Sequence, residues 1–175
     1  MKSILVISSL LTLLLVGCSK PSPEEYMAKA KAARDSSNFT LALEQYEELI
    51  ANHPKSFLAE EAMFSIASIK SDNLHEFSSA VQAYKRVYET YPDGKRAPLA
   101  MFLVGYLNNN EIHDLASAKQ AYEDFLAKYP DHEMAVSARF ELQNLGKRPE
   151  ELLPSIQDTA KPQIATEPKK SSKKK

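Results

Sequence analysis

The sequence has very little cysteine, glycine and tryptophan. Its 175 residues include one cysteine, four glycines and no tryptophan. A single thiol forms neither an internal disulfide nor a zinc site built from several cysteines. Scarce glycine beside abundant alanine, leucine and aromatic residues favours helices. A chain of this length is enough for one domain with a modest core.

The chain as a whole also has little net charge, although its charges are unevenly distributed. The 22 Lys and Arg residues nearly balance the 23 Asp and Glu residues, for a formal net charge of −1. Residues 161–175 hold six Lys and one Glu, whereas residues 18–160 hold fifteen basic and 22 acidic side chains. Because no basic stripe runs through this acidic body, we expect no nucleic-acid partner.

Motifs of known enzyme sites are absent. The sequence contains no GxSxG, HExxH, P-loop or GxGxxG pattern. The neighbouring carboxylates at 47–48, 60–61 and 123–124 diverge on a helix, so we interpret them as solvated faces rather than acid–base pairs. The sequence therefore predicts a protein that is not an enzyme and has no catalytic residue.

The amino-terminal residues have the pattern of an export signal. Residues 4–16 form an apolar run after Lys2. A spanning helix needs about 20 apolar residues, so this shorter run is typical of a secretory signal. It ends with Leu-Val-Gly-Cys at residues 15–18, which resembles a bacterial lipobox. An ordinary secretory signal with a chance cysteine is the alternative.

The resemblance to a lipobox implies a lipid attached to Cys18. Acyl chains contribute about 0.8 kcal/mol per buried CH₂, so two chains anchor a protein stably. Ser19 follows where Asp tends to retain such proteins at the inner membrane, which implies an outer-membrane protein facing the periplasm. Residues 1–17 would be the removed signal peptide and residues 18–23 a lipidated tether. Apart from this covalent lipid, we expect no cofactor.

One motif recurs three times at a constant interval (92 − 54 = 130 − 92 = 38). Each copy contains an alanine, a tyrosine four positions later and a final proline: Ala42, Tyr46 and Pro54; Ala80, Tyr84 and Pro92; Ala118, Tyr122 and Pro130. Apolar residues within each copy follow the helical period of 3.6, and the proline ends the helix. A fixed period of this length indicates stacked helical repeats.

The other half of each repeat keeps the same period. Phe64, Phe102 and Phe140 are separated by the interval of the motif (102 − 64 = 140 − 102 = 38), and Tyr26 precedes Phe64 by the same interval. Each repeat is thus a first helix with this ring and a second helix with the alanine and tyrosine. We predict an all-α fold with helices near residues 24–36, 39–52, 56–71, 76–90, 95–110, 114–128 and 132–145. We expect small residues to face each other where paired helices cross, with Gly105 opposite Ala118.

The order of small residue, alanine, aromatic residue and proline resembles the tetratricopeptide repeat, over about residues 24–146. The resemblance implies a right-handed superhelix of antiparallel helix pairs that binds other proteins. We assign this domain to residues 24–148. The unit is longer than the usual repeat of about 34 residues, and its linker, as at residues 91–94, resembles that of envelope lipoproteins of the BamD type. That likeness implies a role in outer-membrane protein assembly. The YbgF (TolA-binding) type, a coordinator of the envelope and cell division, is the alternative; an accessory protein of an enzyme is a third.

In such a superhelix the first helices line the inner face, which predicts a groove for a peptide or helix of another envelope protein. The predicted groove residues are Tyr26, Phe64, Ser68, Phe102, Tyr106, Asn109 and Phe140. The alternative for the repeated rings is that they fill the space between helices. Tyr106 and Asn109 repeat less, so they are the better candidates for partner-specific contacts.

Two remaining features concern metals and the carboxyl terminus. His75 and His113 occupy equivalent turns, which packed helices hold about 10 Å apart, too far to share one ion. We therefore predict no metal site. Residues 149–175 contain four prolines and end in a lysine-rich run, so we predict a disordered tail. This tail binds an anionic surface of lipid head groups, at about 1 kcal/mol per Lys, or binds the acidic body of a partner, or has no specific role.

Overall fold

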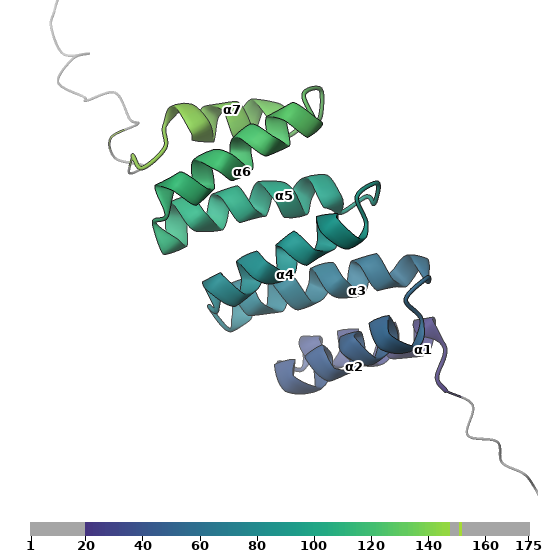
Figure 1. Cartoon of the computed structure of the whole chain (residues 1–175). Helices are drawn as coiled ribbons and strands as arrows, with labels where there is room; N and C mark the ends of the chain where they lie inside the picture. Colours follow the sequence, from purple (N-terminus) through teal and green to yellow (C-terminus); the bar gives the residue numbers. More distant parts are fainter. Residues whose placement is uncertain (1–19, 148–150, 152–175) are drawn as a thin grey trace, which may run out of the picture. The chain divides into compact units, whose positions relative to one another are not determined.

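The computed structural model describes residues 20–147 and residue 151. The predicted signal peptide, Cys18 and nearly all of the predicted tail lie outside the described residues. The described residues contain seven α-helices, and consecutive helices form antiparallel pairs within each of two units, as predicted (Figure 1). Contacts divide the chain into unit 1, Met1–Arg96, and unit 2, Ala97–Lys175, and each unit is described by itself.

Unit 1 contains two helix pairs. Its helices are α1 (Pro23–Asp35), α2 (Phe39–Asn52), α3 (Phe57–Ser68) and α4 (Phe77–Thr90). Helix α1 pairs with α2, and α3 pairs with α4, while α2 also packs on α3. The start of α1 is fixed by a capping box, in which the Ser22 hydroxyl accepts from the Glu25 N–H and the Glu25 carboxylate accepts from the Ser22 N–H.

Unit 2 contains one pair and a further helix. Its helices are α5 (Ala97–Leu107), α6 (Leu115–Lys128) and α7 (Ala135–Gln143). Helix α5 pairs with α6, and α7 packs against α6 as well. Phe102, Tyr122 and Phe125 form the aromatic centre of this core, with buried alanines from α6 and α7 around them.

The first helices of two repeats end differently from the prediction. Helix α3 continues into a π-helical turn, η1 (Ile69–Asn73), and α5 continues into another, η2 (Asn108–Ile112). A π turn closes i→i+5 bonds and so accommodates one more residue than an α turn. Apolar periodicity predicted that these segments were helical, but it contains no signal for the change in hydrogen bonding.

A left-handed residue follows the first helix of each repeat. Ser37, His75 and His113 have φ values of 59°, 54° and 61°, and they recur at the interval of the repeat (75 − 37 = 113 − 75 = 38). This conformation reverses the chain just before the second helix begins. The prediction that His75 and His113 are turn residues is confirmed. Gly146, with φ of 74°, follows α7 in the same conformation.

The repeated alanines and Gly105 lie at close helix contacts. Ala42, Ala80 and Ala118 are fully buried. A Cβ atom on Gly105 would lie 2.7 Å from Cε1 of Tyr122, and its three nearest atoms all belong to that ring. The side chain that closes on Gly105 is thus the tyrosine one turn after Ala118, rather than Ala118 itself.

No helix among residues 20–147 combines the length and the apolar character that crossing a bilayer requires.

Candidate binding site

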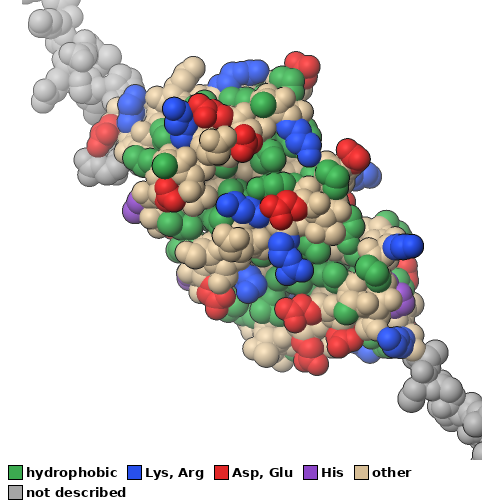
Figure 2. Space-filling model, viewed as in Figure 1, with side chains coloured by type: hydrophobic (Ala, Val, Ile, Leu, Met, Phe, Trp, Pro, Cys, Tyr) green, Lys and Arg blue, Asp and Glu red, His purple; other side chains and the backbone are tan. Residues whose placement is uncertain are grey.

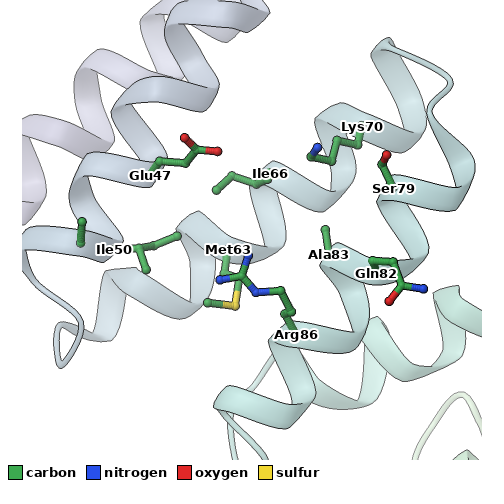
Figure 3. Close-up of a pocket in the computed structure, with 10 residues that line it drawn as sticks. Glu47, Ile50, Met63, Ile66, Lys70, Ser79, Gln82, Ala83 and Arg86 are labelled. Atoms are coloured by element: carbon green, nitrogen blue, oxygen red, sulfur yellow. The ribbon is translucent and has the colours of Figure 1, made fainter.

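A hollow of about 580 Å³ lies within unit 1 (Figure 3). Three helices and the π turn enclose it: Glu47, Ile50 and Ala51 come from α2, Met63 and Ile66 from α3, Lys70 from η1, and Ser79, Gln82, Ala83 and Arg86 from α4. Helices α2 and α4 are the second helices of consecutive repeats, and α3 lies between them in sequence. The hollow is therefore bounded mainly by second helices.

The floor of the hollow is apolar because of the side chains that α3 and its neighbours present. Met63 and Ile66 are almost fully covered, and Ile50 is half-buried beside them. Ala83 is too short to fill the space that a larger residue would occupy on α4. Ligand pockets commonly measure about 300–1,000 Å³, so a hollow of this size has room for a bulky apolar side chain.

Charged side chains surround this floor. Among the described residues, the exposed Glu47 and Arg86 make no ion pair, whereas the Lys70 ammonium lies 3.9 Å from the Glu76 carboxylate. In Figure 3, Glu47 and Lys70 lie on either side of Ile66. Figure 2 shows acidic and basic side chains interspersed with apolar ones on one face of the described residues. A ligand with an apolar centre and opposite charges at its ends would complement the hollow.

Three of the predicted groove rings are buried in the core. Tyr26, Phe64 and Phe102 are 7%, 8% and 8% exposed. The Phe64 ring lies edge-on to Tyr84, with centroids 5.3 Å apart, and the Phe102 ring lies 5.6 Å from Tyr122. These rings offer no open surface in the structure, and their burial agrees with the alternative in which they fill space between helices.

The other predicted groove residues are divided between core and surface. Ser68 in unit 1 is partly buried, and its hydroxyl forms a hydrogen bond with the Tyr84 hydroxyl. Asn109 in unit 2 is 7% exposed, and its Oδ1 accepts from the Gly146 N–H at 3.1 Å. Tyr106 and Phe140 remain exposed, at 40% and 52%. None of the seven residues lines the hollow of unit 1.

The sequence did contain a signal for the hollow. Ser79 and Ala83 are small residues four positions apart on the second helix, on the face next to the buried Ala80. Small side chains on neighbouring turns of a helix leave space between that helix and the helices around it. The groove predicted from the sequence lies on first helices alone and does not include these positions of a second helix.

One carboxylate pair is not a solvated face. Glu61 accepts from the Arg96 guanidinium through both oxygens, at 2.7 Å and 3.0 Å, and Glu60 accepts from the Arg96 backbone N–H at 2.6 Å. The guanidinium also lies 4.9 Å from the centre of the Phe64 ring. The interpretation of residues 60–61 was therefore wrong: both side chains hold the linker after α4 against α3.

No group of three or more His, Cys, Asp or Glu side chains in the described part of the chain is arranged to hold a metal ion.

The comparison with protein families identifies the repeat. Residues 99–132 match the model of the tetratricopeptide repeat. This segment is a tetratricopeptide repeat. It covers most of α5 and all of α6, and it includes the tight contact between Gly105 and Tyr122. No protein of established annotation matches the chain.

The tetratricopeptide repeat indicates the general mode of action. Such repeats usually form non-catalytic scaffolds for protein–protein interaction, because stacked helix pairs offer an extended surface rather than a closed reaction site. The partners of this chain are therefore other proteins, of a kind that the repeat alone does not specify.

Proposed function

We propose that this protein is a membrane-anchored scaffold of the bacterial envelope, and that its unit 1 binds a segment of another protein in the hollow between α2 and α4. The observation that carries the proposal is the apolar floor of the hollow, which unpaired charges flank. The tetratricopeptide repeat supports a binding role, and the Leu-Val-Gly-Cys pattern at residues 15–18 supports the anchor.

The partner segment carries one bulky apolar side chain between two charged ones. Its apolar group enters the hollow and covers Ile50, Met63 and Ile66, which removes apolar surface from water. A carboxylate on one side pairs with Arg86, and a basic group on the other pairs with Glu47. The charges select the partner and its orientation more than they add affinity.

We further propose that the protein lies at the periplasmic side of the outer membrane, with lipid on Cys18. The linker of the repeat, with Tyr-Pro-Asp-Gly at residues 91–94, supports a role in outer-membrane protein assembly like that of the BamD type. The lysine-rich residues 161–175 would bind the anionic lipid head groups of the membrane.

Replacement of the anchor cysteine tests the membrane part. We expect Cys18→Ser to keep its signal peptide and to lose the acylated amino terminus, which mass spectrometry of the purified protein detects. A second variant combines Cys18→Ser with deletion of residues 1–17. We expect washed membranes of cells that express this second variant to contain none of it. Retention there, or an unmodified Cys18 in the wild type, would contradict a lipid anchor.

Filling the hollow tests the binding part. Cross-linking of native membranes followed by mass spectrometry compares the wild type with Ala83→Phe and with Ser78→Phe. Ser78 is an exposed residue of the same helix that does not line the hollow. We expect Ala83→Phe to lose cross-links from α2 and α4 and Ser78→Phe to keep them. Equal cross-linking of all three proteins would overturn the role of the hollow, and recovery of Tol or wall-synthesis proteins would overturn the BamD-like role.

A further inference from the structure

The second helix of a repeat covers one particular face of its first helix. On α3, the Phe64 ring packs against Tyr84 of α4, and on α5 the Phe102 ring packs against Tyr122 of α6. Both phenylalanines are only 8% exposed as a result. The covering helix has the same sequence pattern in both pairs: a buried alanine is followed four positions later by the tyrosine.

Helix α7 has the same face, and no helix among residues 20–147 covers it. Phe140 occupies the position of Phe64 and Phe102, since 140 − 102 = 102 − 64 = 38. Its side chain is 52% exposed, and Val136, one turn earlier, is 72% exposed. The opposite side of α7 is covered, because Ala135 and Ala138 are buried with the core of α6. In this respect α7 is a first helix whose second helix is missing from the described residues.

The residues after α7 do not repeat the alanine and tyrosine of the second helices. One period after Ala118 and Tyr122, the chain has Ile156 and Ala160 (156 − 118 = 160 − 122 = 38). Pro162 lies one period after Asp124, an interior position of α6 (162 − 124 = 38), where proline would remove a hydrogen bond of a helix. A second copy of the chain also has no unoccupied helix of this type among its described residues. Its three equivalent tyrosines, on α2, α4 and α6, are at most 2% exposed.

We propose that α7 binds an amphipathic helix of another protein, which carries a small residue followed four positions later by an aromatic residue. The small residue lets the helix approach α7 closely, and the aromatic ring packs on Phe140 as Tyr84 and Tyr122 pack on their phenylalanines. This inference rests on the proposed scaffold function and names a second surface, on unit 2, with the class of partner that it takes.

The probe for this surface is a helix that the chain itself provides. A fluorescein-labelled peptide with the sequence of residues 115–128 contains the required alanine and tyrosine. A lactam between the side chains at positions 119 and 123 keeps it helical, because these exposed groups already lie 3.8 Å apart at i,i+4 spacing. We expect the peptide to bind the full chain in mild detergent, as measured by fluorescence anisotropy.

Two changes should weaken this binding about tenfold or more: Phe140→Ser in the protein, and alanine in place of the tyrosine in the peptide. The matched control is Phe57→Ser, which removes a ring that is 80% exposed on α3 and should leave the affinity unchanged. Circular dichroism of each variant establishes that its helices are intact.

Several results would overturn the proposal. They are no binding of the stapled peptide at millimolar concentration, and binding that does not respond to Phe140→Ser. Tighter binding after Leu152→Ser and Leu153→Ser together would mean that the chain's own following segment covers α7. A dimer by light scattering that Phe140→Ser abolishes would mean that a second copy does so. Because Phe140 does not line the hollow, failure here leaves the Ala83→Phe experiment as a separate test of the scaffold function.

Discussion

The Ser68 hydroxyl lies 3.1 Å from the Tyr84 hydroxyl and forms a hydrogen bond with it inside unit 1. The equivalent tyrosines, Tyr46 and Tyr122, have buried hydroxyls with no hydrogen-bond partner among the described residues. The difference follows from one position of the repeat, because the residues one period before and after Ser68 are Ala30 and Tyr106. Three tyrosines that look identical in the sequence therefore differ in energetic role.

This difference predicts unequal effects of removing the hydroxyl. Tyr84→Phe should lower the free energy of unfolding by about 1 kcal/mol, because it breaks a hydrogen bond that is largely shielded from water. Tyr122→Phe should be neutral or stabilising, since it removes an unsatisfied buried group. Urea denaturation followed by circular dichroism measures both. Equal losses in the two variants would contradict the pairing seen in the structure.

Alkaline pH should destabilise the fold through the same residues. Burial raises the pKa of Tyr84 to about 12, although the Ser68 hydrogen bond opposes this and Asp72 adds to it. Burial also raises the pKa of Tyr122, with further contributions from Glu141 and Tyr106. Because the folded pKa values exceed the ordinary value of about 10, the folded state holds these protons more tightly. The resulting stability is complete below pH about 10 and is lost as pH rises towards about 12.

The measurement is the urea midpoint of the wild type and of the Tyr84→Phe, Tyr122→Phe double variant on either side of pH about 10. We expect the midpoint of the wild type to fall more steeply with pH. Parallel curves would mean that these two tyrosines do not titrate with unfolding.

The ion pair between Arg96 and Glu61 should contribute measurable stability. Its two bonds, of 2.7 Å and 3.0 Å, join a planar guanidinium to a carboxylate in a fixed geometry. Because both side chains are about one-third exposed, we expect Glu61→Gln to cost only about 1 kcal/mol. The control is Glu123→Gln, which breaks a 3.8 Å pair on the exposed side of α6 and should change the melting temperature little. Similar shifts in the two variants would contradict a special role for the linker contact.

Gly105 should not tolerate a methyl group. The added Cβ of Gly105→Ala would lie 2.7 Å from Tyr122, so the ring or the helix must shift. We expect a loss of about 1–3 kcal/mol in the free energy of unfolding, even though alanine favours helices more than glycine does. Ser137→Ala on the exposed side of α7 is the control and should be neutral or slightly stabilising. Stabilisation by Gly105→Ala would show that α5 and α6 separate easily.

Ser37→Gly should stabilise unit 1. Ser37 has φ of 59°, a conformation that costs a residue with Cβ about 1–2 kcal/mol and costs glycine almost nothing. The greater freedom of glycine in the unfolded chain reduces the gain to roughly 0.5–1 kcal/mol. Ser37→Ala is the matched control, with no gain expected, and thermal denaturation distinguishes the two. A lower melting temperature for Ser37→Gly would contradict the strain argument.

The candidate surfaces show where prediction from the sequence stops. The period of the repeat predicted that Phe64, Phe102 and Phe140 have equivalent places on their helices, which the structure shows. It could not predict that two are 8% exposed and one is 52% exposed. Exposure depends on whether another helix packs on the ring, so identical positions of the repeat differ in exposure among the described residues.

The sequence by itself determined the number, order and approximate limits of the helices, because apolar period, capping residues and proline act through neighbours along the chain. It also carried the tetratricopeptide pattern of residues 99–132. Only the tertiary structure decided which helix faces stay open: the hollow lined by Ala83 and Arg86, the uncovered Phe140, and the carboxylates at 60–61 that hold Arg96. These features depend on contacts between residues that are distant in sequence, and side-chain size and burial at such contacts cannot be derived from a local period.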